Sequence, residues 1–336
     1  MCIVFITTSH PKYPLILIDN RDEYILRPTS RPHWWKHPSG QEVLSSRDLH
    51  RPEMGTWLGI TKTGTVAVLT NYRELTSDTA HPIKGRASRG VMPTEWMAEN
   101  PAKTVKQSVE HFVHDGGVKG VGGFSMVCGK LHRLKEGLAI VSNRADHIDD
   151  VPIVTPEQTK GWGLTNTTFD KSLTWPKVAD GLGGFDGIVE SHAAEGGSED
   201  GLIQALFKHL DTDTLPDVTG KTLQETVLVL KHSIFIRSLG DDKHRKEMEE
   251  AQTRKESDWP TEEDLAQGRV KIDETAHDGF ERGMYGTQRQ TVVLVDNDGN
   301  VTFVERALWD ANGHPITRGE GDVYFRFQVE GWENGS

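Results

Sequence analysis

Short apolar runs, joined in pairs by turn signals, occur at both ends of this 336-residue chain. The runs at 2–8 and 14–19 are rich in β-branched residues, and a short link that contains Pro11 separates them. Runs of this length bounded by turn residues are typical of strands, and two so close in sequence are typical of an antiparallel hairpin. The chain is therefore predicted to begin with a β-hairpin.

Three more segments show the same pairing. Residues 290–308 contain two alternating runs joined through Asn297, Asp298 and Gly299, which is the clearest hairpin signal in the chain. Two further hairpins are predicted at 56–72 and 122–143, and a last strand at 322–329. Sheets are thus expected to form from both ends of the chain.

Helical periodicity is confined to the middle of the sequence. Apolar residues recur at helical spacing in 101–115, which starts with a proline, and in 198–210, which includes the N-cap candidate Ser198. The segment 222–236 fits either a helix or a strand. Hairpin sheets with helices between them predict an α+β fold with sheets under helical layers. Because no linker is visible, 1–336 is predicted to be a single domain.

Charge and cysteine content limit the function classes. The chain has 38 basic and 50 acidic residues and a net charge of −12, which argues against general binding to nucleic acid. No apolar run approaches the roughly 20 residues of a membrane span, and the N-terminal run lacks the basic flank of a secretory signal. With two cysteines and no disulfide framework, the sequence predicts a cytoplasmic protein without stable membrane insertion.

A charged segment at 239–284 departs from this pattern. Between Asp241 and Arg282 there are 14 acidic and 8 basic residues, and its first part has no apolar residues beyond Met248 and Ala251. Such a composition buries little apolar surface. We predict an exposed helix or a disordered insertion, and we favour this over the alternative of a partner-binding segment.

The sequence carries no signature of a metal site or a cofactor. Its 15 histidines include no HExxH motif, and His111 with His114 lacks a third ligand nearby in sequence. The two cysteines form no haem-attachment motif. We therefore predict no metal and no cofactor.

Cys2 stands directly behind the initiator methionine. A small second residue favours removal of Met1, after which Cys2 carries both a thiol and a free α-amino group. The ordinary pKa is about 8.5 for the thiol and about 7.7–8.0 for the amine, so the amine can accept the thiol proton as attack on a carbonyl begins. Such a nucleophile needs no histidine. It does need hydrogen-bond donors for the oxyanion and a charged group that holds the amine.

Chain order supplies candidates for these roles, and each has a structural alternative. Arg21 and Asp22 follow the strand that pairs with the start of the chain, but they also fit a simple ion pair in a turn. Asn71 and Asn166 are amides at strand ends that fit either an oxyanion site or a turn. Arg289 fits a binding site for a substrate carboxylate or phosphate. It also fits a side chain at the edge of a strand that has no binding role.

Several motifs in the same order resemble those of the NRDE family, also called the transport and Golgi organisation protein 2 family. The motifs are, in chain order, MC at the start, DNRDEY at 19–24, GTWLGITKTGTVAVLTNYRE at 55–74, SRG at 88–90, SNR at 142–144, GWGLTNTTFDKSLTWPKV at 161–178, and YGTQRQTVVLV at 285–295 with VTFVER. The resemblance covers residues 1 to about 310 apart from the charged segment, and the number of motifs makes it specific.

The resemblance implies the four-layer α-β-β-α sandwich of the N-terminal nucleophile hydrolases, with two mainly antiparallel sheets. It implies a catalytic set made of Cys2 as nucleophile with Arg21, Asp22, Asn71 and Asn166. For substrate binding it points to Asn20, Glu23, Arg73 and Arg289.

The chain departs from the pattern at two places. Related bile-salt and penicillin amidases space the arginine and the aspartate three apart, whereas here they are adjacent. The usual YGTR motif is also interrupted here by Gln288.

Two functions of different classes follow from the resemblance. The first is a cysteine amidohydrolase or thioesterase that acts on a small acyl conjugate. The second is a non-catalytic carrier of haem or of a lipid such as acyl-CoA, with Trp34 and Trp35 beside His33 and His37 as candidate lining. Ordinary packing is the favoured explanation for the two tryptophans. Family links to Golgi organisation, secretion and lipid homeostasis add the Golgi and the mitochondrion as alternative locations.

Overall fold

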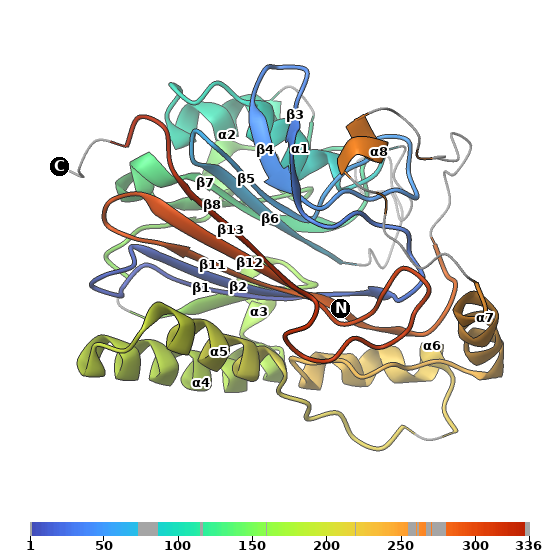
Figure 1. The fold of residues 1–336 in the computed structure, drawn as a ribbon. Helices are drawn as coiled ribbons and strands as arrows, with labels where there is room; N and C mark the ends of the chain where they lie inside the picture. The colour runs from blue at the N-terminus through green and yellow to red at the C-terminus, as the bar shows by residue number, and fades with distance from the viewer. Residues whose placement is uncertain are drawn as a thin grey trace.

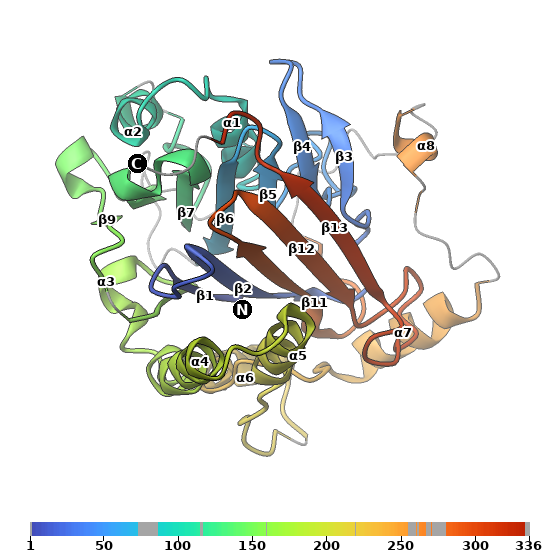
Figure 2. The same ribbon diagram turned by 60° about the vertical axis from the view of Figure 1, so that its left-hand side comes forward.

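Two antiparallel sheets lie face to face, and helices cover the outer face of each (Figures 1 and 2). The computed structural model describes residues 2–72, 87–114, 117–158, 160–218, 220–254, 260, 262–266, 270 and 280–332. The helices below the first sheet come from the segment 176–232, and those above the second come from 91–114. This arrangement confirms the expected α-β-β-α layers.

The first sheet combines the two ends of the chain. Its strands are, in spatial order, β10 (Trp162–Thr165), β1 (Ile3–Thr7), β2 (Leu15–Tyr24), β11 (Tyr285–Val295), β12 (Asn300–Ala307) and β13 (Asp322–Gln328). The hairpins β1–β2 and β11–β12 form as predicted, and Gly299 in the second turn has a φ of 75°. Because β2 pairs with β11, the N-terminal hairpin lies directly beside the C-terminal one.

The second sheet comes from the segment between them. Its strands are, in spatial order, β3 (His33–Lys36), β4 (Glu42–Ser45), β5 (Leu58–Thr61), β6 (Thr65–Asn71), β7 (Phe124–Lys130), β8 (Leu138–Ser142) and β9 (Ile153–Val154). The predicted pairs β5–β6 and β7–β8 are confirmed. Strands β3 and β4, which are short and partly exposed, are absent from the sequence-based expectations.

The central strands of the first sheet, β1, β2 and β11, are buried on both faces. Val4 and Leu17 point into the apolar core between the two sheets, whereas Ile3 and Ile16 point into a second core under the helices. Successive strand residues project to opposite faces. This explains why the strands read as continuous apolar runs, and it means that hydrophobicity alone does not reveal which face a polar residue joins.

The helices follow the predicted positions in part. Their bounds are α1 (Val91–Ala98), α2 (Val105–His114), α3 (Phe169–Ser172), α4 (Pro176–Glu195), α5 (Glu199–Leu210), α6 (Leu223–Thr226), α7 (Asp242–Gln252) and α8 (Glu262–Ala266), with 3₁₀ turns at Leu131–Glu136, Ile148–Asp150 and Val227–His232. The open case at 222–236 is resolved as helix for α6 and the turn after it. Helix α2 begins later than predicted because Thr104 caps it by accepting a hydrogen bond from the Gln107 amide.

The longest helix, α4, was not predicted. It contains Gly181, Gly183, Gly184 and Gly187, and glycine lowers helix propensity. The structure explains Gly181, since a Cβ atom there would lie 2.6 Å from the ring of Phe5. Close packing of α4 on β1 therefore accounts for at least one of the residues that hid this helix.

The cap of α5 offers a stability test. Ser198 precedes the helix, and its hydroxyl accepts a hydrogen bond from the Gly201 amide at 3.1 Å. We expect Ser198→Ala to lower the free energy of unfolding by about 1 kcal/mol. Ser191→Ala, at an exposed position within α4, is the matched control and should leave stability unchanged or slightly higher. Urea unfolding of both variants measures the difference, and equal midpoints would contradict the cap.

The described part of the charged segment contains a packed helix. Helix α7 starts at the N-cap Asp241, which accepts hydrogen bonds from the Lys243 and His244 amides. Its charged residues face outward, whereas Met248 and Ala251 are buried. The two apolar residues of the sequence thus attach an otherwise solvated helix to the domain. Most of the segment after α7 lies outside the described residues.

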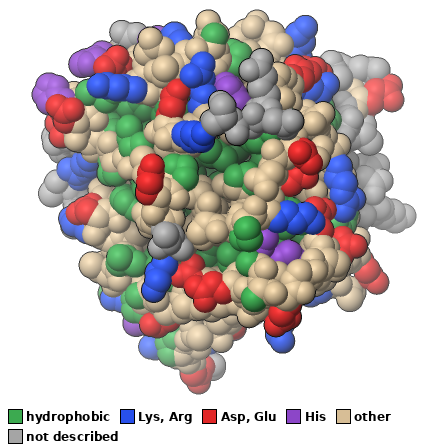
Figure 3. Space-filling model, turned by 90° about the vertical axis from the view of Figure 1, so that its left-hand side faces the viewer, with side chains coloured by type: hydrophobic (Ala, Val, Ile, Leu, Met, Phe, Trp, Pro, Cys, Tyr) green, Lys and Arg blue, Asp and Glu red, His purple; other side chains and the backbone are tan. Residues whose placement is uncertain are grey.

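The described surface matches the mixed charge of the sequence. On the face in Figure 3, Lys and Arg side chains are interspersed with Asp and Glu, and the described residues there form no continuous basic surface. None of the helices in the ranges given above is long and apolar enough to cross a membrane.

Candidate active site

Cys2 lies at the head of β1, between β2 and β10 in the first sheet. It is 5% exposed, and its thiol donates a weak hydrogen bond to the backbone carbonyl of Asp22 at a sulfur–oxygen distance of 3.8 Å. The carbonyl of Cys2 accepts hydrogen bonds from the Thr165 hydroxyl at 2.8 Å and from the Lys177 ammonium at 3.2 Å. Contacts from β2, β10 and α4 therefore fix the position of this residue.

Asp22 lies on β2, the strand next to β1, and its side chain points to the helical side of the sheet. Its carboxylate accepts a hydrogen bond from the Thr287 hydroxyl at 2.7 Å, and the same hydroxyl accepts one from the Ile236 amide. The backbone carbonyl of Asp22 also accepts a hydrogen bond from the Tyr285 hydroxyl. The predicted proximity of Asp22 to Cys2 is thus present in the structure, although the link runs through the backbone.

Arg21 is buried against an aromatic ring. Its guanidinium carbon lies 3.5 Å from the ring centre of Trp57, and Nη1 donates to the Gln288 side-chain oxygen at 2.6 Å. Nε and Nη2 are buried and make no hydrogen bond to any residue that the structure describes. Burial lowers the pKa of the guanidinium. A buried cation with unused donors is suited to an oxyanion or a substrate carboxylate.

The departure from the YGTR motif coincides with a β-bulge. Thr287 pairs with Asp22 and Arg289 pairs with Arg21, so Gln288 is an extra residue on β11. Its side chain accepts from Arg21 and donates to the Ile25 carbonyl at 2.9 Å. The extra residue Gln288 therefore supplies a polar contact to Arg21, and the pairing of β2 with β11 continues on both sides of the bulge.

Asn71 and Asn166 meet where the two sheets approach each other. The Asn166 amide donates to the Asn71 backbone carbonyl, and the Thr70 hydroxyl donates to the Thr165 carbonyl at 2.8 Å. The Asn71 side-chain oxygen is buried and has no hydrogen-bond partner among the described residues. Thr165 also donates to the carbonyl of Cys2, so both predicted asparagines are linked through hydrogen bonds to the backbone of Cys2.

The charges near Cys2 are strongly perturbed. In the chain that carries Met1, burial raises the pKa of the thiol to about 11; the Asp22 and Asp19 carboxylates add to this rise, and the amino terminus opposes it. Burial lowers the pKa of Lys177 to about 8, although Asp22, Cys2 and Asp19 favour its charged form. Burial and the charge of Asp22 raise the pKa of Asp19 to about 8. Thiolate is therefore scarce at neutral pH, and attack requires a base.

This rise in pKa predicts the pH dependence of alkylation. In chains that retain Met1, the rate of Cys2 labelling by iodoacetamide should still increase at pH 10, because the thiolate fraction grows until the pH passes about 11. In chains that have lost Met1, the ammonium is on Cys2 itself. It should lower the pKa of the thiol, and with it the pH at which the labelling rate is half of its maximum. Intact mass separates the two forms, and Cys128→Ala removes the other thiol. A plateau by pH 9 with Met1 retained would contradict the prediction.

The expected substrate-binding residues separate into different environments. The Asn20 side chain points toward the helices and donates to the Leu210 and Ile234 carbonyls at 2.8 and 2.9 Å. It therefore joins helix to sheet, and its role in substrate binding stays a prediction. Glu23 accepts from the Tyr24 amide and lies 3.7 Å from Arg27. Arg73 lies outside the described residues.

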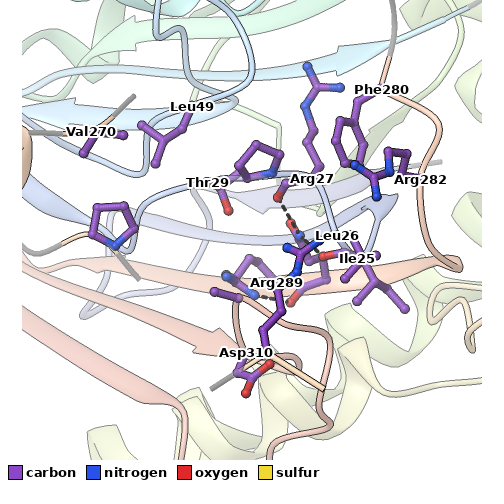
Figure 4. Close-up of a pocket in the computed structure, with 15 residues that line it drawn as sticks. Ile25, Leu26, Arg27, Thr29, Leu49, Val270, Phe280, Arg282, Arg289 and Asp310 are labelled. Atoms are coloured by element: carbon purple, nitrogen blue, oxygen red, sulfur yellow. Dashed lines mark hydrogen bonds between the residues drawn. The ribbon is translucent and has the colours of Figure 1, made fainter. Parts of the chain in front are cut away.

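Arg289 is buried between the sheets. Nη1 donates to the Gln288 and Trp309 carbonyls, and Nε lies 3.6 Å from the Glu305 carboxylate. Burial lowers its pKa to about 9, although Glu305 favours the charged form. It occupies the register position next to Arg21. Arg289 is thus an internal residue (Figure 4), and the alternative of a side chain at a strand edge does not apply.

Lys177 and Thr165 are the main site residues that sequence reasoning missed. Both lie inside the motif stretch 161–178, but neither was assigned a role. Lys177 lies between Pro176 and Val178 at the start of α4, and in the structure it is 1% exposed. A buried ammonium group requires a polar partner. Recognising this burial from the sequence needs knowledge that α4 packs on β1.

The residues proposed for a carrier are engaged in packing. Trp34 meets the ring of Phe327 edge-on, and Trp35 donates to Ser45 while Arg47 covers its ring. These contacts agree with the favoured packing interpretation. Within the ranges described above, no group of three or more His, Cys, Asp or Glu side chains is placed to hold a metal ion.

Comparisons with known proteins agree with the motifs. Human transport and Golgi organization protein 2 homolog is 26% identical over 323 residues, covering 92% of this chain and 94% of the human protein. The bovine homolog is 28% identical over 348 residues, covering 98% and 100%. Among solved structures, penicillin V acylase from Agrobacterium tumefaciens is similar with a TM-score of 0.46, 11% identity and coverage of 98% and 87%. The profile of the family described as "Transport and Golgi organisation 2" matches residues 1–310, and the chain belongs to that family.

Proposed function

We propose that the protein is a hydrolase with an N-terminal cysteine nucleophile, acting on the amide or thioester bond of a small acyl conjugate. One observation carries the proposal. Cys2 is buried at the head of a central strand, its carbonyl is held by Thr165 and Lys177, and Arg21 has unused donors on the adjacent strand. A plain structural thiol requires neither a fixed backbone carbonyl nor a buried, incompletely bonded arginine beside it.

The first step begins once Met1 has been removed. The α-amine of Cys2 takes the thiol proton as Sγ attacks the substrate carbonyl, and the carbonyl π electrons move to the oxygen. Transfer of the thiol proton to this amine as attack begins is general base catalysis within one residue. The unused N–H groups of Arg21 and the amide of Asn71 are candidate donors to the oxyanion.

The second half of the cycle releases both products. The tetrahedral intermediate collapses to an acyl thioester on Cys2, and the α-ammonium returns its proton to the leaving amine or thiolate. The neutral amine then accepts a proton from water as the water oxygen attacks the thioester carbonyl. The second tetrahedral intermediate collapses with cleavage of the C–S bond, the acid is released, and the α-ammonium returns its proton to the Cys2 thiolate. Lys177 and Asp22 take no part in bond making. We assign them the role of holding the N-terminal residue in position.

Intact mass spectrometry tests this proposal. Purified protein is mixed with a panel of activated acyl esters and thioesters and quenched within seconds. We expect chains that lack Met1 to gain the acyl mass on Cys2, whereas chains with an N-terminal extension stay unmodified because their amine is blocked in a peptide bond. Equal acylation of both forms would refute the role of the amine. The family links to secretion and lipid homeostasis, and the haem or lipid carrier function, stay predictions.

A further inference from the structure

Strand β13 forms one edge of the first sheet (Figure 2). It has seven residues, whereas the other outermost strands, β10, β3 and β9, have four, four and two. In the described parts of the chain, β13 pairs with β12 on one side and with no strand or isolated bridge on the other. Its outer edge is therefore a row of backbone donors and acceptors that another strand can bind.

The sequence of β13 lacks most features that protect an edge. Native edge strands are usually short, interrupted by a bulge, or marked by proline or lysine. The strand reads DVYFRFQ, and its pairing with β12 runs from Asp322 to Gln328 without a register shift. Tyr324 is 42% exposed, and Phe325 and Phe327 are only partly buried. A regular, aromatic edge of this kind favours the addition of a further strand.

The hydrogen-bond pattern shows which residues carry the outward backbone groups. The Gly321 carbonyl accepts a hydrogen bond from the last residue of β12 at 3.1 Å, and the Val329 amide donates to the Gly299 carbonyl at 2.9 Å. The odd-numbered residues at both ends of β13 thus face β12. Because backbone groups alternate in direction along a strand, those of the even-numbered residues point outward. Tyr324 and Arg326 are therefore at the centre of the outer edge.

The two faces of β13 differ in chemistry. Arg326 lies on the helical face, where its guanidinium is 3.5 Å from the Glu199 carboxylate and 5.5 Å from the ring centre of Tyr324. Phe325 and Phe327 project to the opposite face and pack against the core between the sheets. The edge thus presents a cation beside an aromatic ring on one face and two phenylalanines on the other.

A second copy of β13 matches this edge. When two antiparallel copies align over the full strand, Phe325 faces Phe325 of the second copy across a two-fold axis, and each Tyr324 faces an Arg326. Aromatic pairs and pairs of an aromatic ring with a cation both stabilise a sheet when they stand at opposite positions. The edge is therefore complementary to itself.

Other registers are less favourable. The even-numbered residues must face one another, because they carry the outward backbone groups. An axis at Arg326 pairs only residues 324–328 and places two guanidiniums opposite each other. An axis at Tyr324 pairs only residues 322–326. It also places Arg326 opposite Asp322, whose carboxylate already accepts two hydrogen bonds from an arginine of β12 at 2.8 Å.

We propose that the outer edge of β13 binds the same edge of a second copy, so that the chain forms a symmetric dimer through one continuous sheet. The backbone groups of the two edges pair with each other, and the apolar surface of Phe325 and Phe327 is removed from water. In the sheet order, β11 and β12 separate β13 from β2 and from the strand headed by Cys2. The dimer is therefore independent of whether Cys2 is catalytic.

Sedimentation velocity of the full chain tests the dimer. We expect a species of twice the 37.5 kDa chain mass that increases with protein concentration up to about 100 µM. Arg326→Pro removes an outward N–H group but no hydrogen bond to β12, so the strand should stay paired within the chain. It should raise the dissociation constant of the dimer by at least about tenfold. Arg326→Ala keeps the N–H group and should have a smaller effect.

Two substitutions at Tyr324 test the register. Tyr324→Arg places a second guanidinium opposite Arg326 of the other copy, whereas Tyr324→Glu places a carboxylate there. Because each pair occurs twice in the dimer, we expect Tyr324→Arg to raise the dissociation constant by about tenfold and Tyr324→Glu to change it by less than about threefold. Equal effects of the two charges would overturn the pairing of Tyr324 with Arg326.

Leu228→Arg is the control for a charge added at another exposed apolar position. Leu228 lies in the 3₁₀ turn of the helical layer and is 78% exposed. This substitution should leave the dissociation constant unchanged. The side chains of Tyr324 and Arg326 are also exposed, so all variants should melt close to the native protein. A chain that sediments as a monomer throughout the concentration series would refute the dimer, and so would a dimer that Leu228→Arg disrupts while the β13 variants do not.

Discussion

Replacing Cys2 with alanine should reduce hydrolysis of any accepted acyl substrate by about 10⁴-fold or more, the order seen when a covalent nucleophile is removed. The sulfur is the only atom that would bond to the acyl group, and no neighbour described at the site offers another thiol. Cys2→Ser should lie closer to alanine than to the native protein, since a hydroxyl is a far weaker nucleophile when the base is an amine. Initial rates on an activated thioester measure the effect.

The control for this prediction is the other cysteine. Cys128 is fully buried in the core under α1 and α2, and burial raises the pKa of its thiol well above the ordinary value. Cys128→Ala should therefore retain full activity and lose about 1 kcal/mol of stability. Cys2→Ala should melt within a few degrees of the native protein, because only a small side chain at the chain end is shortened. Native-like turnover in Cys2→Ala would refute the hydrolase proposal outright.

Replacing Lys177 with methionine should lower kcat by about 10²-fold without abolishing acylation, because a positioning residue orients the nucleophile but forms no bond to substrate. The substitution removes the hydrogen bond to the Cys2 carbonyl. It also removes the positive charge that opposes Asp22 and Asp19 near the thiol. The pKa of Cys2 should consequently rise further, and the midpoint of alkylation should move to higher pH.

The pH readout distinguishes this role from simple loss of stability. Methionine at this position removes the charged hydrogen bond to the Cys2 carbonyl, worth about 2 kcal/mol, so the variant should still fold. Lys171→Met, an exposed position in α3, is the matched control and should change neither the alkylation midpoint nor kcat. If Lys177→Met lowers the melting temperature but leaves the alkylation midpoint unchanged, Lys177 is a structural residue and the positioning role is wrong.

Much of the secondary structure follows from local sequence. The hairpins at 2–19, 56–72, 122–143 and 290–308 form because each joins two apolar runs that are close along the chain. Helix α5 follows from its apolar period and its N-cap Ser198. Prediction from local sequence fails where tertiary packing outweighs the helix propensity of the segment. The glycine-rich α4 is helical because its small residues allow close contact with β1, and that benefit is invisible in the segment alone.

The site shows the same division. Motifs pointed to Cys2, Arg21 and Asp22, and the pairing of β1 with β2 brings them together. Asn20 lies in the same motif, yet its side chain turns to the helices and binds backbone carbonyls. Strand β2 is buried on both faces, so it shows no alternation of polar and apolar residues. The sequence therefore does not reveal that Asn20 and Arg21 point to opposite faces of the sheet.

By itself, the sequence determined the hairpins, the layered α+β class and the place of a thiol at the head of the first strand, because these depend on residues that are close along the chain. Only the tertiary structure decided that β2 lies against β11, that a bulge at Gln288 contacts Arg21, and that Lys177 reaches the Cys2 carbonyl. Each of these contacts joins segments more than 150 residues apart. Their formation depends on the summed packing of two sheets and their helices, which no single stretch of sequence contains.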